Sequence, residues 1–191
     1  GGWDAATGER LWTLRPKTPG DFNVPTPLVL GERLLLASEN NGTRLIAFDR
    51  PGQPREVASY AGCKPDMHTP VQAGDRVFAV HKNKIHCLSA ADLTLIWTAS
   101  DRALAGRVSL AASSDRVLAL TQAGELVLID ALADQLVILS RLALFDDDVV
   151  LYAHPAVVGD RLYVRGPGHL FCISLATVEQ ASDLPGQSSR R

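Results

Sequence analysis

The sequence lacks the features that mark several large classes of protein. Only three of its 191 residues are cysteine, and none are paired at CxxC spacing, so neither a disulfide framework nor a cysteine zinc site is indicated. A net charge of −2 leaves no broad basic surface, which argues against nucleic acid and acidic membranes as partners. No apolar run approaches the length of a membrane-spanning helix, so we expect no membrane span.

Common catalytic signatures are missing as well. The sequence contains no GxSxG nucleophile elbow, no Walker loop and no dinucleotide-binding fingerprint. Gly166-Pro167-Gly168 has the composition of a hairpin turn only. Nothing in the sequence therefore singles out a catalytic residue.

What the sequence does contain is one unit copied four times. Each copy has an apolar run, a tight Gly/Asp turn closed by arginine, a second apolar run, a second turn and a third apolar run. The arginines that set the register are 43, 40 and 45 residues apart: Arg33, Arg76, Arg116 and Arg161. This period, with three or four short strands, is typical of a β-propeller blade. We predict an all-β fold of about four four-stranded antiparallel blades from a larger ring of seven or eight.

The repeat also defines the organisation of the chain. We predict one partial β-propeller over residues 1–175, with a blade remnant at 1–14, blades at about 26–60, 69–99, 109–142 and 154–175, and a flexible tail at 176–191. Blade four offers only three clear strands. The chain opens at Gly1 in mid-repeat, so we interpret it as a C-terminal fragment whose earlier blades, with any export signal, are missing. A closed ring of four blades, completed by residues 1–14, is the less favoured alternative.

Two segments carry a family resemblance. GWDAATGERLW at 2–12 and CLSAADLTLIW at 87–97, together with PAVVGDRLYVRGPGHLFCISL at 155–175, resemble the pyrroloquinoline-quinone-like propeller repeats. Such repeats occur in quinoprotein dehydrogenases and in many non-enzymatic bacterial propellers. The resemblance implies a periplasmic or extracellular location.

The tryptophan-docking motif of that family is matched best in the first segment. In the second segment Ser89 replaces its Asp and Leu93 its Gly, and blade three retains Asp130 alone. The resemblance implies a structural role, the docking of one blade onto the next, for Asp4, Thr7, Gly8, Trp12 and Trp97.

The same resemblance sets an expectation about cofactors. Active quinoprotein dehydrogenases use adjacent cysteines, a tryptophan under the quinone, and Glu, Asn and Asp around a calcium ion. Adjacent cysteines are absent here, and Asp21, Asn23, Glu39 and Asn40 sit in no motif that matches. We therefore expect no cofactor in this fragment. Pyrroloquinoline quinone (PQQ) with calcium belongs to the alternative, an enzyme.

One alignment column suggests a binding surface. Thr26, Thr69, Ser109 and His154 correspond at the predicted start of the innermost strand, where propeller loops line the mouth of the central channel. From this column and its neighbours we predict a polar ligand-binding surface made of His68, Arg107, Tyr152 and His154. The alternative is that the hydroxyls in the column only satisfy nearby backbone groups.

Three other groups receive structural interpretations. His81 and His86 would face each other across a hairpin, but the repeat aligns His86 with Ile46, Val127 and Phe171, which favours packing over a metal site. Cys87 and Cys172 share a column with Ala47 and Leu128 and are interpreted as small buried core residues. Asp146, Asp147 and Asp148 lack the spacing of a calcium loop and are interpreted as a solvated loop.

These observations favour a binding module over an enzyme. We expect a non-catalytic propeller scaffold that binds a protein, peptide or glycan through its loop faces, with no metal site. The alternative is part of a quinone-dependent alcohol or sugar dehydrogenase.

Overall fold

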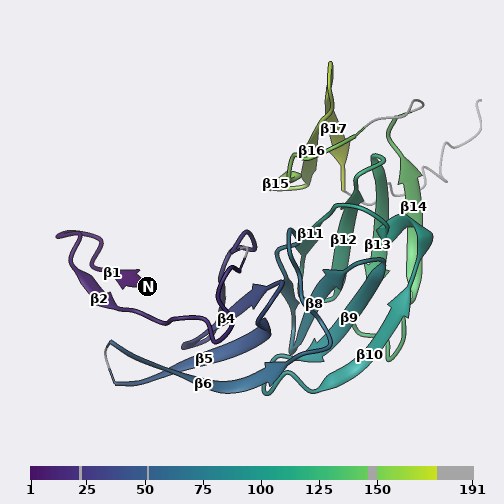
Figure 1. Cartoon of the computed structure of the whole chain (residues 1–191). Helices are drawn as coiled ribbons and strands as arrows, with labels where there is room; N and C mark the ends of the chain where they lie inside the picture. The colour runs from purple at the N-terminus through teal and green to yellow at the C-terminus, as the bar shows by residue number, and fades with distance from the viewer. Residues whose placement is uncertain (22, 51, 146–149, 176–191) are drawn as a thin grey trace, which may run out of the picture.

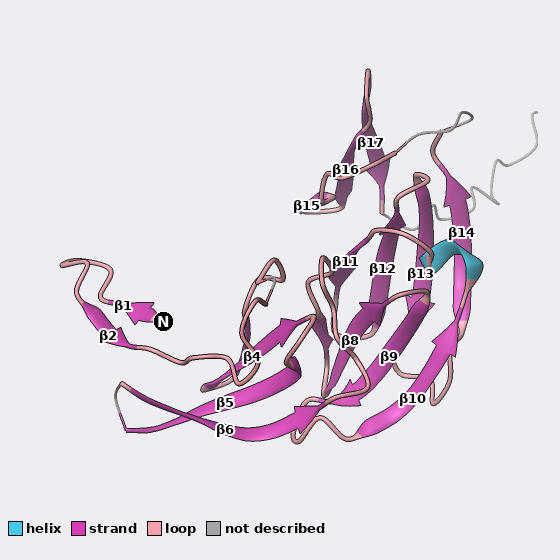
Figure 2. Ribbon diagram, in the orientation of Figure 1, coloured by secondary structure: helices cyan, strands magenta, loops and turns pink. Residues whose placement is uncertain are grey.

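A computed structural model describes residues 1–21, 23–50, 52–145 and 150–175, and the chain in these ranges is built from β-strands (Figure 1). Within them the helical content is one short 3-10 turn, η1 (Arg102–Leu104), drawn in cyan in Figure 2. No helix in the described ranges is long and apolar enough to cross a membrane. The aspartates at 146–148 and the predicted tail at 176–191 lie outside the described residues.

The strands form five antiparallel sheets in chain order. β1 (Gly2–Trp3) pairs with β2 (Arg10–Trp12). Blade one contains β3 (Leu28–Leu30), β4 (Arg33–Ser38), β5 (Gly42–Arg50) and β6 (Gln53–Tyr60). Blade two contains β7 (Val71–Ala73), β8 (Arg76–His81), β9 (Lys84–Ser89) and β10 (Leu95–Ser100). Blade three contains β11 (Val108–Ala112), β12 (Arg116–Thr121), β13 (Glu125–Asp130) and β14 (Ile138–Ala143), and blade four contains β15 (Ala156–Val158), β16 (Arg161–Arg165) and β17 (Leu170–Ser174).

The sheets follow one another around an arc, as Figure 1 shows, so the predicted all-β propeller architecture is confirmed. The alternative of a closed four-bladed ring is wrong. β1 and β2 pair with each other in a sheet of their own and add no strand to β15–β17.

The hydrophobic cores lie between blades, which explains why the repeat must be copied. One core joins blades one and two, with Leu35 and Leu45 packed near Val77 and Leu88. A second joins blades two and three around Phe78 and Trp97, and a third joins blades three and four around Leu162. Burial of apolar surface at ~25 cal/mol per Å² is the main force that holds such arrays together.

Hydrogen bonds from arginine side chains reinforce these cores at equivalent positions of the blades. Arg33 of blade one donates to the carbonyl oxygens of Ala91 and Ala90 in the β9–β10 turn, at 2.6 and 3.2 Å. Arg76 of blade two donates in the same way to the Ala133 carbonyl and the Asp134 carboxylate of the next blade, at 2.5 and 2.9 Å. Two of the four arginines that mark the repeat in the sequence, Arg33 and Arg76, thus connect neighbouring blades.

The tryptophan-docking segments build the same turns twice. A carboxylate oxygen of Asp4 accepts hydrogen bonds from the backbone N–H groups of Ala6 and Thr7, which lowers the pKa of Asp4. Gly8 then adopts a left-handed φ of 72°. Leu93 takes the equivalent left-handed conformation, with φ at 61°, although it carries a side chain.

The two tryptophans of these segments contact the next blade. The Trp12 ring lies 5.1 Å from the Phe48 ring of β5, between ring centroids. Trp97 is 8% exposed, packs edge-on against Phe78, and donates its indole N–H to the Ala133 carbonyl at 3.0 Å. The indole N–H of Trp97 therefore binds blade three, and its ring lies in the core between blades two and three.

The strand register corrects the alignment of blade one. Ala79 pairs with His86, and Ala119 with Val127, whereas the equivalent Leu36 pairs with Arg44. The column of His86 therefore contains Arg44 and not Ile46, and that of Cys87 contains Leu45 and not Ala47. Matching the sequences by their apolar runs therefore shifts the register of β5 by two residues.

The cysteines also differ from expectation in one respect. Cys63, Cys87 and Cys172 are all free, and the first two are buried, but Cys172 is exposed on β17. β17 is the last strand of its sheet, so no further strand of that sheet covers it among the described residues.

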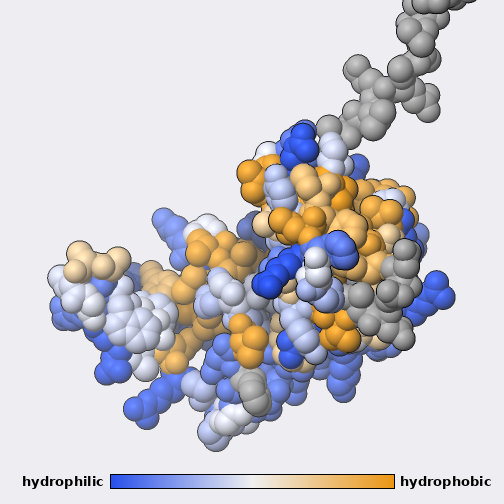
Figure 3. All heavy atoms as spheres, turned by 90° about the horizontal axis from the view of Figure 1, so that it is seen from above, coloured by the Kyte–Doolittle hydropathy of each residue, from blue (hydrophilic) through white to orange (hydrophobic). Residues whose placement is uncertain are grey.

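Figure 3 shows apolar surface gathered on the right-hand part of the molecule, and Val158 and Leu170 of blade four are exposed by 64% and 66%.

Candidate functional site

One end of the blades carries all the loops that build the site. Because consecutive strands are antiparallel, the β4–β5, β8–β9 and β12–β13 turns lie at the same end as the linkers that enter β7, β11 and β15. The β7–β8 and β9–β10 turns lie at the opposite end. We call the first end the loop face.

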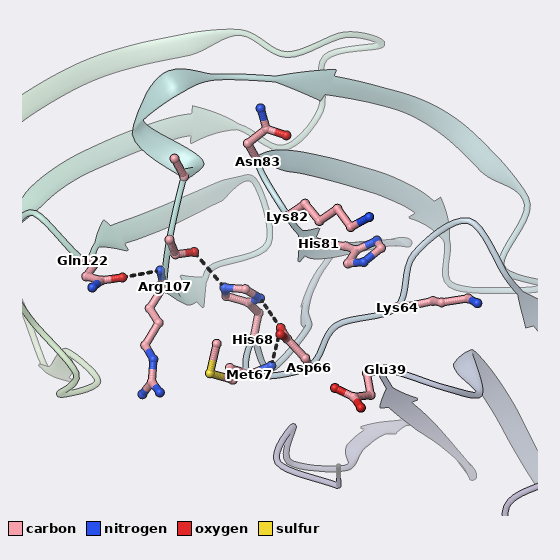
Figure 4. Close-up of a pocket in the computed structure, with 12 residues that line it drawn as sticks. Glu39, Lys64, Asp66, Met67, His68, His81, Lys82, Asn83, Arg107 and Gln122 are labelled. Atoms are coloured by element: carbon pink, nitrogen blue, oxygen red, sulfur yellow. Dashed lines mark hydrogen bonds and ion pairs between the residues drawn. The ribbon is translucent and has the colours of Figure 1, made fainter. Parts of the chain in front are cut away.

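The larger cavity of the loop face has a volume of about 680 Å³, and we call it the His68 cavity (Figure 4). The linker between blades one and two supplies Lys64, Asp66, Met67 and His68, and the β8–β9 turn supplies His81, Lys82 and Asn83. The next linker supplies Ala105, Gly106 and Arg107, and Glu39 and Gln122 come from the other two turns.

His68 connects two linkers at the centre of this cavity. Its side chain is buried, with Nε2 3.2 Å from the Gly106 carbonyl oxygen and Nδ1 3.6 Å from the Asp66 carboxylate. The Asp66 carboxylate also accepts a hydrogen bond from the Met67 N–H. Burial lowers the pKa of His68 and outweighs the opposite effect of the carbonyl and the carboxylate. Nε2 thus joins the two linkers, whereas Nδ1 is buried without a hydrogen-bond partner.

The second cavity, of about 450 Å³, contains the predicted column, and we call it the Tyr152 cavity. Arg107, Tyr152 and His154 all line it, whereas His68 lines only the neighbouring His68 cavity. Thr26, Thr69 and Ser109 line it too. The two cavities share Met67 and Arg107, so the structure brings the four predicted ligand-binding residues to one continuous region of the loop face.

Gln122 holds the two sides of this region together. Its side-chain oxygen accepts a hydrogen bond from the Arg107 N–H at 2.9 Å, and its backbone carbonyl accepts one from the Leu151 N–H at 2.8 Å. Tyr152 follows directly, and the Arg107 guanidinium carbon lies 4.4 Å from the centre of its ring. A guanidinium stacked at this distance is attracted by the ring quadrupole and keeps its donors free at the edge.

One contact agrees with the alternative that the hydroxyls of the column only satisfy nearby backbone groups. Thr69 accepts a hydrogen bond from the Thr26 backbone N–H at 3.1 Å, so one hydroxyl of the column satisfies the backbone of the preceding blade. Thr26 and Thr69 lie two residues before β3 and β7, and only Ser109 lies inside a strand. Thr69 is therefore a linking residue, and the larger side chains around it are the ones available to a ligand.

The histidine pair of blade two is placed differently from the expectation. His81 pairs with Lys84 and His86 with Ala79, so the two imidazoles do not face each other directly. No group of three or more His, Cys, Asp or Glu that could hold a metal ion occurs among the described residues. His86 is buried with no hydrogen bond to either ring nitrogen.

Several residues considered for a quinone–calcium site have structural partners. Trp97, which could otherwise lie under a quinone, is buried in the core between blades two and three. Asp21 and Asn40 belong to a loop network in which the Asp21 carboxylate accepts hydrogen bonds from Ser38 and from the Asn40 N–H. The expectation that this chain carries no cofactor is left as a prediction.

Several cavity residues were missed by the sequence reasoning. Lys64, Lys82 and Gln122 lie outside the column, because they belong to a linker and to turns. The chain topology could have identified the residues in turns, because every turn between the second and third strands of a blade must lie on the loop face. Lys82 carries a further mark, a left-handed φ of 57° at a non-glycine residue.

The fold and the loop-face cavities define the chain as a propeller of PQQ-like repeats. It belongs to the family described as outer membrane protein assembly factor BamB, whose family model matches residues 2–180. The family resemblance inferred from the docking motifs is thereby confirmed. No curated protein matches the chain.

Solved structures show the same fold at low identity. BamB from Moraxella catarrhalis has a TM-score of 0.64 at 17% identity, over 89% of this chain and 49% of that one. The β-propeller domain of Cps50 (Swd1) from Myceliophteria thermophila has a TM-score of 0.61 at 14% identity, over 90% and 62%. The computationally designed protein Ika8 has a TM-score of 0.63 at 14% identity, over 90% and 51%. The chain thus spans roughly half to three-fifths of the length of these structures.

Proposed function

We propose that the chain is part of a non-catalytic propeller scaffold that binds a protein or peptide segment in the joined cavities of its loop face. The proposal rests on the way in which the two cavities join. The His68 and Tyr152 cavities meet at Met67 and Arg107, with volumes of about 680 and about 450 Å³. Their combined size suits several side chains of an extended segment better than one small molecule.

The rigidity of the walls supports the same proposal. His68, Gln122 and Thr69 each tie a linker to a neighbouring blade or loop through hydrogen bonds at 3.2, 2.9 and 3.1 Å. A site that is already ordered loses less conformational entropy when a ligand binds. Binding residues on loops held by a rigid scaffold are the usual arrangement in such folds.

The family supports an envelope location for this scaffold. The family description names outer membrane protein assembly, and we infer that this chain also acts in the cell envelope. Fractionation of cells that express the tagged protein from its own gene tests the inference. Recovery in the cytoplasmic fraction alone would contradict it.

Peptide binding is tested by blocking the loop face selectively. Ala105 is exposed and lines the His68 cavity, so Ala105→Trp fills part of that space. Ala91→Trp adds the same bulk to an exposed residue in the β9–β10 turn at the opposite end. Peptides selected from a random library on the unmodified chain should bind Ala105→Trp at least about tenfold more weakly, and Ala91→Trp unchanged.

Two outcomes would contradict the proposal. Either no peptide is selected, or the selected peptides bind both variants equally. Circular dichroism of both variants checks that the added tryptophan leaves the sheets intact.

A further inference from the structure

The charges around the His68 cavity are unevenly balanced. Lys64, Lys82 and Arg107 bring three cations to its wall, whereas Glu39 and Asp66 bring two carboxylates. None of the three cations forms a salt bridge within the described part of the chain. Arg107 instead stacks on Tyr152.

The two carboxylates offset two of the three positive charges and leave an excess of one cation on the cavity wall. Asp66 is held by the Met67 N–H at 2.8 Å and lies 3.6 Å from His68 Nδ1. Glu39 comes from the turn of blade one, on the wall opposite the linker that supplies Arg107, as Figure 4 shows. Clefts lined by an excess of one sign of charge concentrate ligands of the other sign.

Cations elsewhere in the described chain are often matched with acids. Arg55 is paired with Asp49 at 2.7 Å, Lys17 with Glu56 at 2.9 Å, and Arg141 with both Asp101 and Glu125. Acidic partners for surface cations are therefore available in this fold. Lys64, Lys82 and Arg107 form no ion pair among the described residues, which leaves the donors of these side chains for a ligand.

The neighbouring Tyr152 cavity has a mixed lining, in which the hydroxyls of Thr26, Thr69 and Ser109 lie beside apolar side chains. Val24, Leu120 and Leu151 line it together with the ring of Tyr152, and it contains no acidic residue among those that line it. A ligand that spans both cavities therefore meets an excess of cations on one side and, on the other, apolar side chains mixed with hydroxyl groups. Arg107 stands at the boundary between them.

We propose that the loop face recognises an extended peptide segment in which an acidic side chain lies next to an apolar one. The acidic side chain enters the His68 cavity and pairs with Lys82, Lys64 or Arg107, and the apolar side chain enters the Tyr152 cavity. This inference rests on the proposed function and specifies its ligand. A single inorganic anion would leave most of the 680 Å³ and the whole Tyr152 cavity empty.

The test compares three short labelled peptides by fluorescence anisotropy. One alternates glutamate and tyrosine, the second has glutamine in place of glutamate, and the third has lysine. We expect the glutamate peptide to bind about tenfold more tightly than the glutamine peptide and the lysine peptide to bind most weakly. Binding of the glutamate peptide should weaken as salt is raised, because exposed charges are screened.

Two lysines on the same hairpin provide a matched pair of variants. Lys82 lines the cavity, whereas Lys84 is exposed, begins β9 and does not line it. Lys82→Glu should weaken the glutamate peptide by about three- to tenfold, since it replaces an attraction by a repulsion. Lys84→Glu makes the same change in net charge and should have less than a twofold effect.

The possible results separate this inference from the proposed function. Equal binding of the glutamate and glutamine peptides, or equal effects of the two lysine variants, overturns acidic recognition. In that event, library peptides that remain sensitive to Ala105→Trp would still uphold the scaffold proposal. If no peptide of any kind senses Ala105→Trp, both proposals fail.

Discussion

Arg76 and Trp97 donate hydrogen bonds to the same acceptor, the carbonyl oxygen of Ala133. The guanidinium lies at 2.5 Å and the indole nitrogen at 3.0 Å. Both donors belong to blade two, and the acceptor lies in the β13–β14 turn of blade three. One carbonyl group thus receives the polar contacts of a blade junction, while the Trp97 ring fills the core beside it.

The first prediction separates the ring of Trp97 from its donor. Trp97→Phe keeps an aromatic ring but loses the indole N–H, so the free energy of unfolding should fall by about 1 kcal/mol. Trp97→Ala also opens a cavity and should cost about 3–5 kcal/mol. Urea unfolding followed by circular dichroism measures both. Trp3 is 59% exposed, so Trp3→Ala is the control. An equal loss of unfolding free energy for Trp3→Ala and Trp97→Ala would show that Trp97 does not dock the two blades.

The second prediction concerns Leu93, which has a left-handed φ of 61° and is 2% exposed. Its side chain belongs to the core between blades one and two, which explains why leucine stands where the docking motif has glycine. Leu93→Ala loses that packing and keeps the unfavourable dihedral, whereas Leu93→Gly loses the packing but relaxes the dihedral. Leu93→Gly should therefore be about 1 kcal/mol more stable than Leu93→Ala.

Leu88 supplies the matched control for this comparison. It is fully buried in the same core but lies in β9, where glycine is less favourable than alanine. Urea unfolding should rank Leu88→Gly below Leu88→Ala, the reverse of the order at Leu93. The same order at both positions would show that the dihedral of Leu93 is not strained.

The architecture could be predicted from the sequence because the same strand-and-turn pattern recurs several times. Arg33 and Arg76 recur at a blade-like period, and the structure shows why, since each clasps the turn of the next blade. Such a contact requires one residue type at one position of the repeat, so it can be recognised in the sequence as a recurring arginine. The order and type of the strands followed from this pattern.

The register of blade one could not be predicted in the same way. Arg44 occupies the position of His86 and Val127, but polar and apolar residues at one buried position share no visible pattern. The fit of each strand against its partner determined the register, and that fit depends on packing rather than on local composition.

The candidate site was predicted only where it followed the repeat. Arg107, Tyr152 and His154 come from one alignment column and its neighbours, and they meet in one cavity. Lys64 and Lys82 reach the adjacent cavity from a linker and a turn whose lengths differ between blades. Their convergence depends on how loops from separate blades fold over one another, which is tertiary information.

The third prediction is that native thiol reactivity is confined to Cys172. Cys172 is exposed, whereas burial raises the pKa of Cys63 to about 12 and that of Cys87 to about 11. Because the thiolate is the reactive form, the two buried thiols are both shielded and protonated at pH 8. A chromogenic disulfide reagent should titrate one thiol in the native protein and three in denaturant. Cys172→Ser should abolish the native reaction; its persistence would contradict the burial of the other two.

The fourth prediction is that His86→Leu stabilises the protein, and more so in acid. His86 is buried, neither ring nitrogen has a hydrogen-bond partner, and Val127 and Phe171 fill the equivalent positions of blades three and four. An unsatisfied buried polar group costs about 1–3 kcal/mol, which should exceed the loss of the edge contact with Tyr60. The expected net gain in the free energy of unfolding is about 1 kcal/mol at pH 8.

The pH dependence of this gain has a definite sign. Burial lowers the pKa of His86 below its ordinary value, and His81 and Lys84 lower it further. As the pH falls through ~6.5, the unfolded chain therefore takes up a proton that the folded chain does not, and stability is lost. His86→Leu removes this loss, so its advantage in urea unfolding should be larger at pH 5.5 than at pH 8. A residual slope should persist because burial also lowers the pKa of His68 and of His81. An advantage that shrinks on acidification would mean that His86 is protonated in the folded protein, with an acceptor that holds its charge.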